Sequence, residues 1–335
     1  MRKGDVIVLE HLPAAVAYAA GGGRRELDGP LGSAFDIAER DTRFGQKTWE
    51  MAESELARRT LETAFGKVPH DIGTPDVVFA GDLQCQCTAS GYAMRSEDVP
   101  FAGLYGACST MAESAALAAC LVDGGFAACA AAMASSHFCA AERQFRTPLG
   151  YGAKRTPTAQ WTVTGAGAVV LASGRGPRVR AVQFGRVRDL GVFDASNMGA
   201  AMAPAAAETL VRYFDATGET PDAFDAVYTG DLGAVGSNLL GSLLELEGVR
   251  LQNHRDCGLE IYGRTAPGSG ASGAGCSAAV LSGHILPMLA RGEMRRVLFL
   301  ATGALMSQTT SLQGESIPGV AHLVEFCSEE AMACS

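Results

Sequence analysis

The chain has 335 residues, of which 47% are hydrophobic and 19% are charged, and its formal net charge is −9. A single hydrophobic core rarely grows beyond about 300 residues, so two core units are expected. Because phosphate binding needs a basic surface, the negative charge argues against nucleic acid as the main partner.

The first half of the chain alternates between predicted strands and helices. It starts with a strand-like run at residues 6–9, without the pattern of a secretory signal. The longest apolar region, residues 112–134, is interrupted by Glu113, Asp123 and two glycines, so we expect no membrane span there. Hydrophobic spacing predicts the other elements of this half: helices at 47–65, 87–96 and 109–122, and strands at 77–80, 101–105, 128–135 and 166–173.

The second half repeats this alternation after a glycine- and proline-containing boundary at residues 174–177. Strands this hydrophobic, joined by helices, belong in mostly parallel sheets that are covered on both faces. Two polar and poorly periodic stretches, residues 21–41 and 136–164, are long for connections, and such loops usually carry function or cover a pocket. The predicted elements are helices at 203–214, 236–246 and 277–289, strands at 178–187, 226–229, 258–262, 296–302 and 321–326, and a frayed tail from residue 327.

Two pairs of similar segments indicate an internal duplication. Gly-Asp-Leu follows a predicted strand at Asp82 and again at Asp231, which is 149 positions later (231 minus 82). A cysteine followed by a serine occurs at Cys108 and at Cys276, which is 168 positions later (276 minus 108). Similar elements in the same order predict two similar halves, residues 1–175 and 176–335, that pack face to face. Any chemistry is then expected at the seam between them.

Cys108 is the sharpest candidate for a functional residue. It lies where a predicted strand ends and an alanine-rich helix begins, after Gly106 and Ala107 and before Ser109. The positive end of the helix dipole and the free N–H groups there favour a thiolate and can hold a carboxylate or an oxyanion. The alternative is that a small residue is simply needed for packing at this turn.

Three further candidates follow predicted strands. His137, preceded by Ser136, comes after the strand that follows the Cys108 helix, so it can approach the same edge of the sheet. The alternative for His137 is a structural role. Asp82 and Asp231 end equivalent strands, and ligands gather at the strand ends of open α/β sheets. Each aspartate can equally cap the helix that follows it.

Arg143 and Arg146 lie on the long polar stretch beyond His137 and can bind a carboxylate in fork fashion, or simply pair with surface acids. No cofactor site is expected, because the glycine-rich residues 268–275 lack the acidic residue of a dinucleotide fingerprint. We interpret them as a close backbone approach between the halves. The ten cysteines are scattered and are expected to be reduced thiols of a cytosolic protein, without a metal site.

The duplicated halves, with Gly-Ala-Cys-Ser opening a helix, resemble the thiolase superfamily. More specific segments, which together span about residues 29–326, resemble the stage V sporulation protein AD family. They are GPLG at 29–32, QKTWEMAE at 46–53, AGDL at 80–83, LVDGGF at 121–126, AERQFR at 141–146, MAPAAA at 202–207 and TGAL at 302–305. The resemblance implies an α/β, thiolase-like fold in which two βαβαβαββ halves form a five-layered α-β-α-β-α sandwich.

The resemblance also implies a function. Members of this family belong to Gram-positive spore formers, bind dipicolinic acid (pyridine-2,6-dicarboxylate), and act in its uptake into the forespore and its release at germination. Their partners are membrane-embedded proteins of the same operon, which implies a cytoplasmic protein of the forespore, peripheral at the spore inner membrane. The superfamily typically forms two-fold homodimers. A ligand in the former acyl pocket would lie over Cys108, with Ser109, Ser136, His137, Asp82, Asp231, Arg143, Arg146 and Cys276 as candidate contacts, and with or without calcium.

Departures from the condensing enzymes favour binding over catalysis. The histidine that follows the second-half strand in those enzymes is absent from residues 227–231, and their asparagine is absent from residues 273–276. Cys108 therefore has the position of an acyl-accepting nucleophile without its proton-transfer partners. The alternatives are an acyltransferase or condensing enzyme that uses Cys108 with another base, and a structural assembly subunit.

Overall fold

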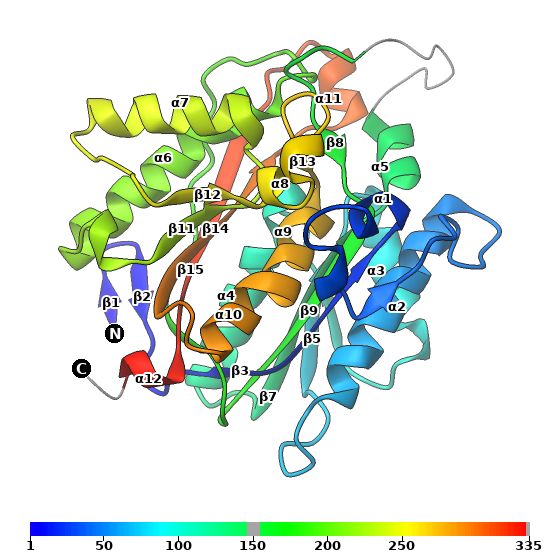
Figure 1. Cartoon of the computed structure of the whole chain (residues 1–335), viewed down its shortest axis with the longest axis vertical. Helices are drawn as coiled ribbons and strands as arrows, with labels where there is room; N and C mark the ends of the chain where they lie inside the picture. The colour runs from blue at the N-terminus through cyan, green and yellow to red at the C-terminus, as the bar shows by residue number, and fades with distance from the viewer. Residues whose placement is uncertain (146–154, 333–335) are drawn as a thin grey trace.

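The structure, a computed structural model, describes residues 1–145 and 155–332. It is built on two half-sheets that continue into one another (Figure 1). In the first half the strand order is β3-β9-β7-β5-β6, and in the second half it is β10-β15-β14-β11-β12. Numbered within each half, both orders are 1-5-4-2-3, so the predicted duplication is confirmed. β3 and β10 join the half-sheets through the antiparallel pair Ala14 and Arg178.

The strands of the two half-sheets correspond one to one. Those of the first half are β3 (Ala14–Gly22), β5 (Val77–Gly81), β6 (Phe101–Gly103), β7 (Cys129–Ser136) and β9 (Gly165–Ala172). Those of the second half are β10 (Arg178–Gln183), β11 (Ala226–Thr229), β12 (His254–Asp256), β14 (Arg296–Ala304) and β15 (Gly319–Cys327). β5 and β11 pair in parallel with both of their neighbours, whereas β9 and β15 pair in antiparallel fashion. Mixed half-sheets of this kind need helices on both faces to bury their apolar strands.

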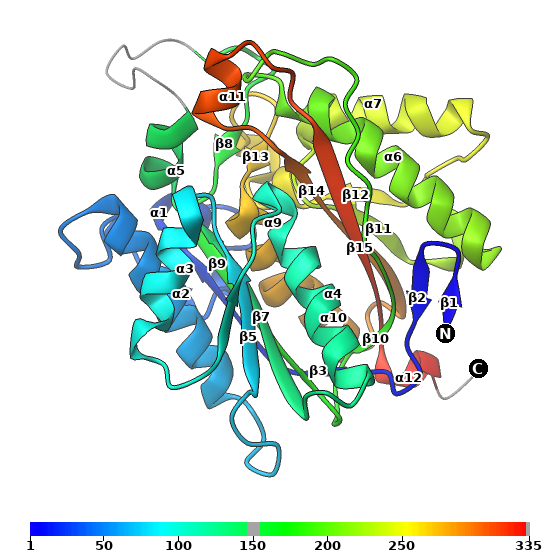
Figure 2. The ribbon, with the colours of Figure 1, turned by 180° about the vertical axis from the view of Figure 1, so that it is seen from behind.

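Helices form three layers around the half-sheets, which gives the predicted five-layered thiolase-like sandwich (Figures 1 and 2). α2 (Trp49–Gly66) and α3 (Thr88–Ala93) cover the outer face of the first half-sheet. α6 (Met198–Thr217) and α7 (Gly233–Leu246) cover the second. The buried middle layer holds α4 (Thr110–Asp123), α9 (Ala274–Val280) and α10 (Leu286–Ala290). The remaining short elements are β1 (Arg2–Lys3), β2 (Val6–Val8), α1 (Arg24–Leu27), β4 (Ile37–Ala38), α5 (Phe138–Phe145), β8 (Trp161–Thr162), α8 (Cys257–Glu260), β13 (Ala271–Ser272), α11 (Gln308–Leu312) and α12 (Glu329–Met332).

Small residues let the two halves approach closely. A Cβ at Gly167 of β9 would lie 2.0 Å from the Ala278 carbonyl oxygen of α9. A Cβ at Gly275 would lie 2.2 Å from the Gly165 carbonyl oxygen. Atoms essentially never come this close, so only glycine fits at either position. The predicted close backbone approach at residues 268–275 is therefore confirmed.

Three local predictions are corrected. The strand expected at residues 258–262 is wrong: the strand is β12, and Asp256 then caps α8 by accepting a hydrogen bond from Leu259 N at 3.1 Å. β3 was not expected, because seven of its nine residues are alanine or glycine and Val16 is its one β-branched residue. The predicted loop at 136–164 contains α5 and β8. In the described residues, no helix is long and apolar enough to span a membrane.

Candidate functional site

Cys108 is fixed in a strained turn at the seam between the halves. Ala107, the preceding residue, has a φ of 51°, which is unfavourable for any residue with a Cβ. The turn is held by the Ser109 hydroxyl, which donates to the Gly106 carbonyl oxygen at 2.6 Å. Gly303, at the end of β14 in the other half, packs on this turn, since a Cβ there would lie 2.3 Å from the same carbonyl oxygen. The second half therefore helps to set the position of the thiol.

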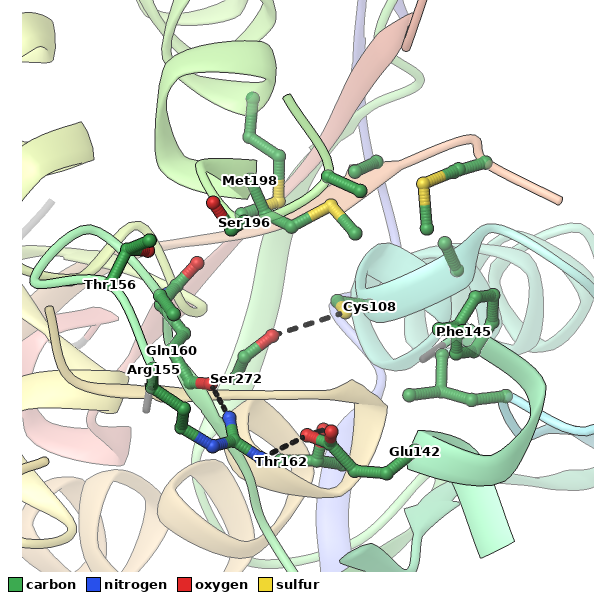
Figure 3. Close-up of a pocket in the computed structure, with 17 residues that line it drawn as sticks. Cys108, Glu142, Phe145, Arg155, Thr156, Gln160, Thr162, Ser196, Met198 and Ser272 are labelled. Atoms are coloured by element: carbon green, nitrogen blue, oxygen red, sulfur yellow. Dashed lines mark hydrogen bonds and ion pairs between the residues drawn. The ribbon is translucent and has the colours of Figure 1, made fainter. Parts of the chain in front are cut away.

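The thiol opens into a cavity of about 280 Å³ that both halves line (Figure 3). Its volume lies near the lower end of small-molecule pockets, roughly 300 Å³. The walls are largely apolar and include the side chains of Met198, Met202 and Met306. Two charged residues, Glu142 and Arg155, lie among the described lining residues, and no histidine does.

A buried carboxyl group stands behind one end of the cavity. The Cys108 sulfur lies 4.0 Å from the Ser272 hydroxyl, which donates to the Asp231 carboxylate at 3.1 Å. The same carboxylate accepts hydrogen bonds from the Thr302 hydroxyl at 2.8 Å and from Gly273 N at 2.9 Å. Asp231, the predicted strand-end candidate, is thus brought together with Cys108 by the packing of the two halves.

This environment opposes ionisation of the thiol. Burial raises the pKa of Cys108 well above its usual value, and the charge of Asp231 raises it further. Burial also raises the pKa of Asp231, although its hydrogen bonds counteract part of that effect. The prediction that the helix start favours a thiolate is therefore wrong, because burial and a neighbouring carboxyl outweigh the helix dipole. Cys108 is a neutral thiol at physiological pH.

Arg155 also lines the cavity, near Thr162 of β8, which pairs with Ser272 of β13 (Figure 3). Its guanidinium pairs with the Glu142 carboxylate at 3.0 Å and donates to the Gln160 carbonyl oxygen at 2.6 Å (Figure 3). The same group lies 4.7 Å from the ring centre of Trp161 and 5.3 Å from that of Phe138. Such a guanidinium, held by aromatic rings and a carbonyl group, is well suited to bind a carboxylate.

Sequence reasoning missed Arg155, Glu142 and the three methionines. Glu142 and Arg155 lie in the long polar stretch for which no regular element was predicted, so nothing in the pattern assigned them to a common place. The length of that stretch did point to a pocket-covering role, which agrees with their position in the cavity wall.

His137 is separated from Cys108. Its Nε2 donates to the Thr42 carbonyl oxygen at 2.8 Å, and its Nδ1 accepts from Cys139 N at 3.2 Å. The ring stacks on Trp49 with ring centres 5.5 Å apart, and burial lowers the pKa of His137. It lines a different surface depression, so the structure does not bring it to the thiol.

Asp82, Ser136 and Cys276 lie outside the cavity wall. The Asp82 carboxylate accepts from Gln84 N at 2.8 Å and from Ser90 N at 2.7 Å, which fixes the start of α3. Ser136 contacts the other half, since its hydroxyl accepts a hydrogen bond from Gly275 N at 3.1 Å, whereas the contact of Cys276 stays within the second half. The Ser136 hydroxyl donates to the Val163 carbonyl oxygen at 2.8 Å, and the buried Cys276 thiol donates to the Gly230 carbonyl oxygen at 3.7 Å. The contacts of Asp82 fit the capping role that the sequence left open for it, and Ser136 and Cys276 do not line the cavity as expected.

Arg143, one of the two arginines predicted to bind a carboxylate, does not line the cavity. Arg143 forms an ion pair with Glu50 at 3.0 Å, and about half of its side chain is exposed. Arg146 lies outside the described residues. Within residues 1–145 and 155–332, no group of histidine, cysteine and acidic side chains is arranged to hold a metal ion.

Structural comparison places the fold among thiolase-like proteins. OleA of Xanthomonas campestris with bound cerulenin matches with a TM-score of 0.61 and 14% sequence identity, over 98% of this chain and 99% of that chain. A variant of OleA with cerulenin gives a TM-score of 0.62 at 12% identity, over 98% and 99% of the two chains. Identities this low support the shared fold alone.

Sequence comparison gives a closer relationship. Stage V sporulation protein AD of Bacillus subtilis (strain 168) is 42% identical over 322 residues, which are 95% of this chain and 95% of that protein. Residues 4–327 also match the family Stage V sporulation protein AD. The chain therefore belongs to the stage V sporulation protein AD family.

Proposed function

We propose that this sporulation protein is a non-enzymatic receptor that binds dipicolinate, free or as its calcium chelate, in the cavity beside Cys108. One observation carries the proposal: an apolar, methionine-lined cavity is lined by an arginine and by a thiol that a buried carboxyl group backs through Ser272. The family membership supports a role in sporulation, and dipicolinate is the ligand that the family resemblance implies.

The lining suits a flat aromatic acid. Thioether groups are polarisable and make favourable contacts with aromatic rings, so Met198, Met202 and Met306 can pack against a pyridine ring. Arg155 supplies the cation that a buried carboxylate needs, and the hydroxyl groups of Thr156, Thr162 and Ser196 add hydrogen-bonding capacity. Calcium would arrive with the ligand, which itself supplies oxygen donors.

The chemistry of the thiol argues against turnover. An acyl-accepting cysteine works as a thiolate and needs a proton acceptor and oxyanion donors. Here burial and Asp231 both raise the pKa of Cys108, and no histidine lines the described part of the cavity. The acyltransferase alternative keeps one supporting observation, the strained turn at Ala107, because such turns often present nucleophiles.

Calorimetry and mass spectrometry together test the proposal. Titration of the full chain with dipicolinate should release or absorb heat with a saturable profile, and picolinate should compete. If the folded protein gives no binding heat with dipicolinate, in the absence and presence of calcium, the receptor proposal fails. Incubation with acyl thioesters should leave the intact mass unchanged. A stable adduct that disappears in Cys108→Ala would establish covalent chemistry instead.

The receptor proposal includes a place and partners. A dipicolinate receptor of the forespore would act in the cytoplasm beside the spore inner membrane, where membrane-embedded proteins of the same operon would receive its ligand. A homodimer is the expected form. Light scattering of the purified chain would measure its oligomeric state, and flotation with vesicles that carry the partner proteins would measure the membrane association. A monomer that never floats would contradict this part of the proposal.

A further inference from the structure

The geometry points to an exchange of ion-pair partners inside the cavity: a ligand carboxylate takes the place of Glu142 on Arg155, and Glu142 serves as the counter-ion while the cavity is empty. This inference rests on the proposed receptor function and adds a mechanism of ligand selection to it. It concerns the part of the cavity wall formed by Arg155 and Glu142 (Figure 3).

Arg155 and Glu142 each need a partner of opposite charge. The side chain of Arg155 is 20% exposed and that of Glu142 is 6% exposed, so both charges are largely removed from water. An unpaired charge in such a place is strongly destabilising. The 3.0 Å ion pair therefore keeps the wall of the empty cavity neutral at this end.

The guanidinium of Arg155 is also held by groups other than Glu142. One of its nitrogens donates to the Gln160 carbonyl oxygen at 2.6 Å, and its face lies over Trp161 and Phe138. Trp161 and Phe138 stack on one another with ring centres 4.3 Å apart, which makes this support rigid. Arg155 can therefore stay in position when its carboxylate partner changes.

Glu142 also has a hydrogen-bond partner other than Arg155. Its carboxylate also accepts a hydrogen bond from the Thr162 hydroxyl at 3.1 Å, and this contact does not involve Arg155. Glu142 has further interactions besides these two. A ligand carboxylate can then form the two parallel hydrogen bonds that an arginine offers, while Glu142 keeps its hydrogen bond from Thr162.

Asp231 sets the direction of the ligand. Its carboxyl group stands behind Ser272 at the Cys108 end, so a ligand carboxylate placed there would meet a group of like charge. Arg155 is the cation among the described lining residues. The exchange therefore selects ligands that carry a carboxylate on an aromatic ring, and it places one such carboxylate on Arg155.

Calorimetric titration with dipicolinate of the full-length protein and three variants tests the exchange. Arg155→Gln should weaken binding by roughly 30-fold or more, because a buried ligand carboxylate loses its partner. Glu142→Gln should tighten binding by roughly three- to tenfold, because the internal competitor for Arg155 is removed. The double variant should bind like Arg155→Gln, since Glu142 competes only through Arg155. Arg212→Gln is the matched control, because Arg212 pairs with Glu208 at 2.7 Å on the outer helix α6.

The outcomes separate the two proposals. If wild-type protein does not bind dipicolinate, the receptor function fails and the exchange fails with it. If wild-type protein binds but Arg155→Gln binds equally well, only the exchange is overturned. A Glu142→Gln variant that binds more weakly than wild type would also overturn it, since Glu142 would then support the ligand. Circular dichroism checks the fold of each variant. If Arg155→Gln does not fold, Arg155→Lys takes its place; it keeps the charge but not the fork, so it should bind dipicolinate more weakly than wild type, and equal binding would overturn the exchange.

Discussion

Substitution of Gly303 by alanine tests whether the seam between the halves sets the position of the Cys108 turn. The added Cβ would lie 2.3 Å from the Gly106 carbonyl oxygen and 3.1 Å from Ser109 N, whereas real Cβ contacts essentially never fall below 3.0 Å. The turn and β14 must therefore separate by at least 0.7 Å (3.0 minus 2.3). Overpacking of this kind costs about 1–3 kcal/mol of the free energy of unfolding. Dipicolinate binding should also weaken, because Ala107 and Cys108 line the cavity.

Thermal unfolding monitored by calorimetry measures the change in stability. With an unfolding entropy of roughly 2.1 cal/mol/K per residue, 1 kcal/mol corresponds to about 1.5 °C for a chain of 335 residues, so Gly303→Ala should lower the Tm by about 1.5–4 °C. Gly241→Ala is the matched control. Gly241 lies inside α7, and a Cβ there has no neighbour within 4 Å. That substitution should raise the stability by about 0.5–1 kcal/mol through helix propensity.

The comparison refutes the reasoning if both glycine substitutions change the Tm in the same direction and to the same extent. An unchanged Tm and unchanged dipicolinate binding in Gly303→Ala would show that the seam accommodates the added methyl group without a cost in free energy. In that case the close approach of Gly303 and Gly106 would not control the thiol. A loss of binding without a loss of stability would show that the displacement is confined to the cavity.

Two further predictions concern buried carboxyl groups. Asp231→Asn removes a negative charge beside the thiol, so the pKa of Cys108 should fall and its alkylation by iodoacetamide at pH 8 should be faster. Peptide mass mapping measures the rate of alkylation. An unchanged rate would contradict the role of that charge. Burial and the charge of Asp82 raise the pKa of Glu53 to about 8. Because its folded-state pKa is raised, Glu53 stabilises the fold at low pH and this stabilisation is lost as pH rises from about 4.5 through 8. Glu53→Gln should flatten that decline in urea-unfolding midpoints, and a decline as steep as that of wild type would assign it to other groups.

The sequence predicted the fold well because its signals are local and repeated. The Gly-Asp-Leu copies at Asp82 and Asp231 indicated two equivalent strand ends, and the structure gives both halves the same strand order. The helix predicted at 47–65 is observed as α2. β3 escaped prediction because alanine and glycine carry no period-2 pattern, although the strand lies at the centre of the joined sheets.

The site was predicted in part, because its geometry depends on packing that spacing does not show. Strand-end reasoning singled out Cys108 and Asp231, which lie together. The same reasoning singled out His137 and Asp82, whose hydrogen bonds to Thr42 and to the start of α3 direct them elsewhere. Which strand end faces the seam is decided by the packing of the halves, and one sequence carries no periodic signal for it.

The distribution of charge along the cavity is what separates a receptor from a condensing enzyme on this scaffold. A thioester-cleaving cysteine needs its cation or proton acceptor beside the sulfur, where it stabilises the thiolate. In this chain the carboxyl group of Asp231 lies beside the sulfur, and Arg155, the cation of the described lining, is paired with Glu142. The strain at Ala107 still presents the thiol to the cavity, but as a neutral polar contact. In the proposed receptor, an aromatic acid therefore gains most free energy by pairing one carboxylate with Arg155, and the thiol serves as a contact rather than as a nucleophile.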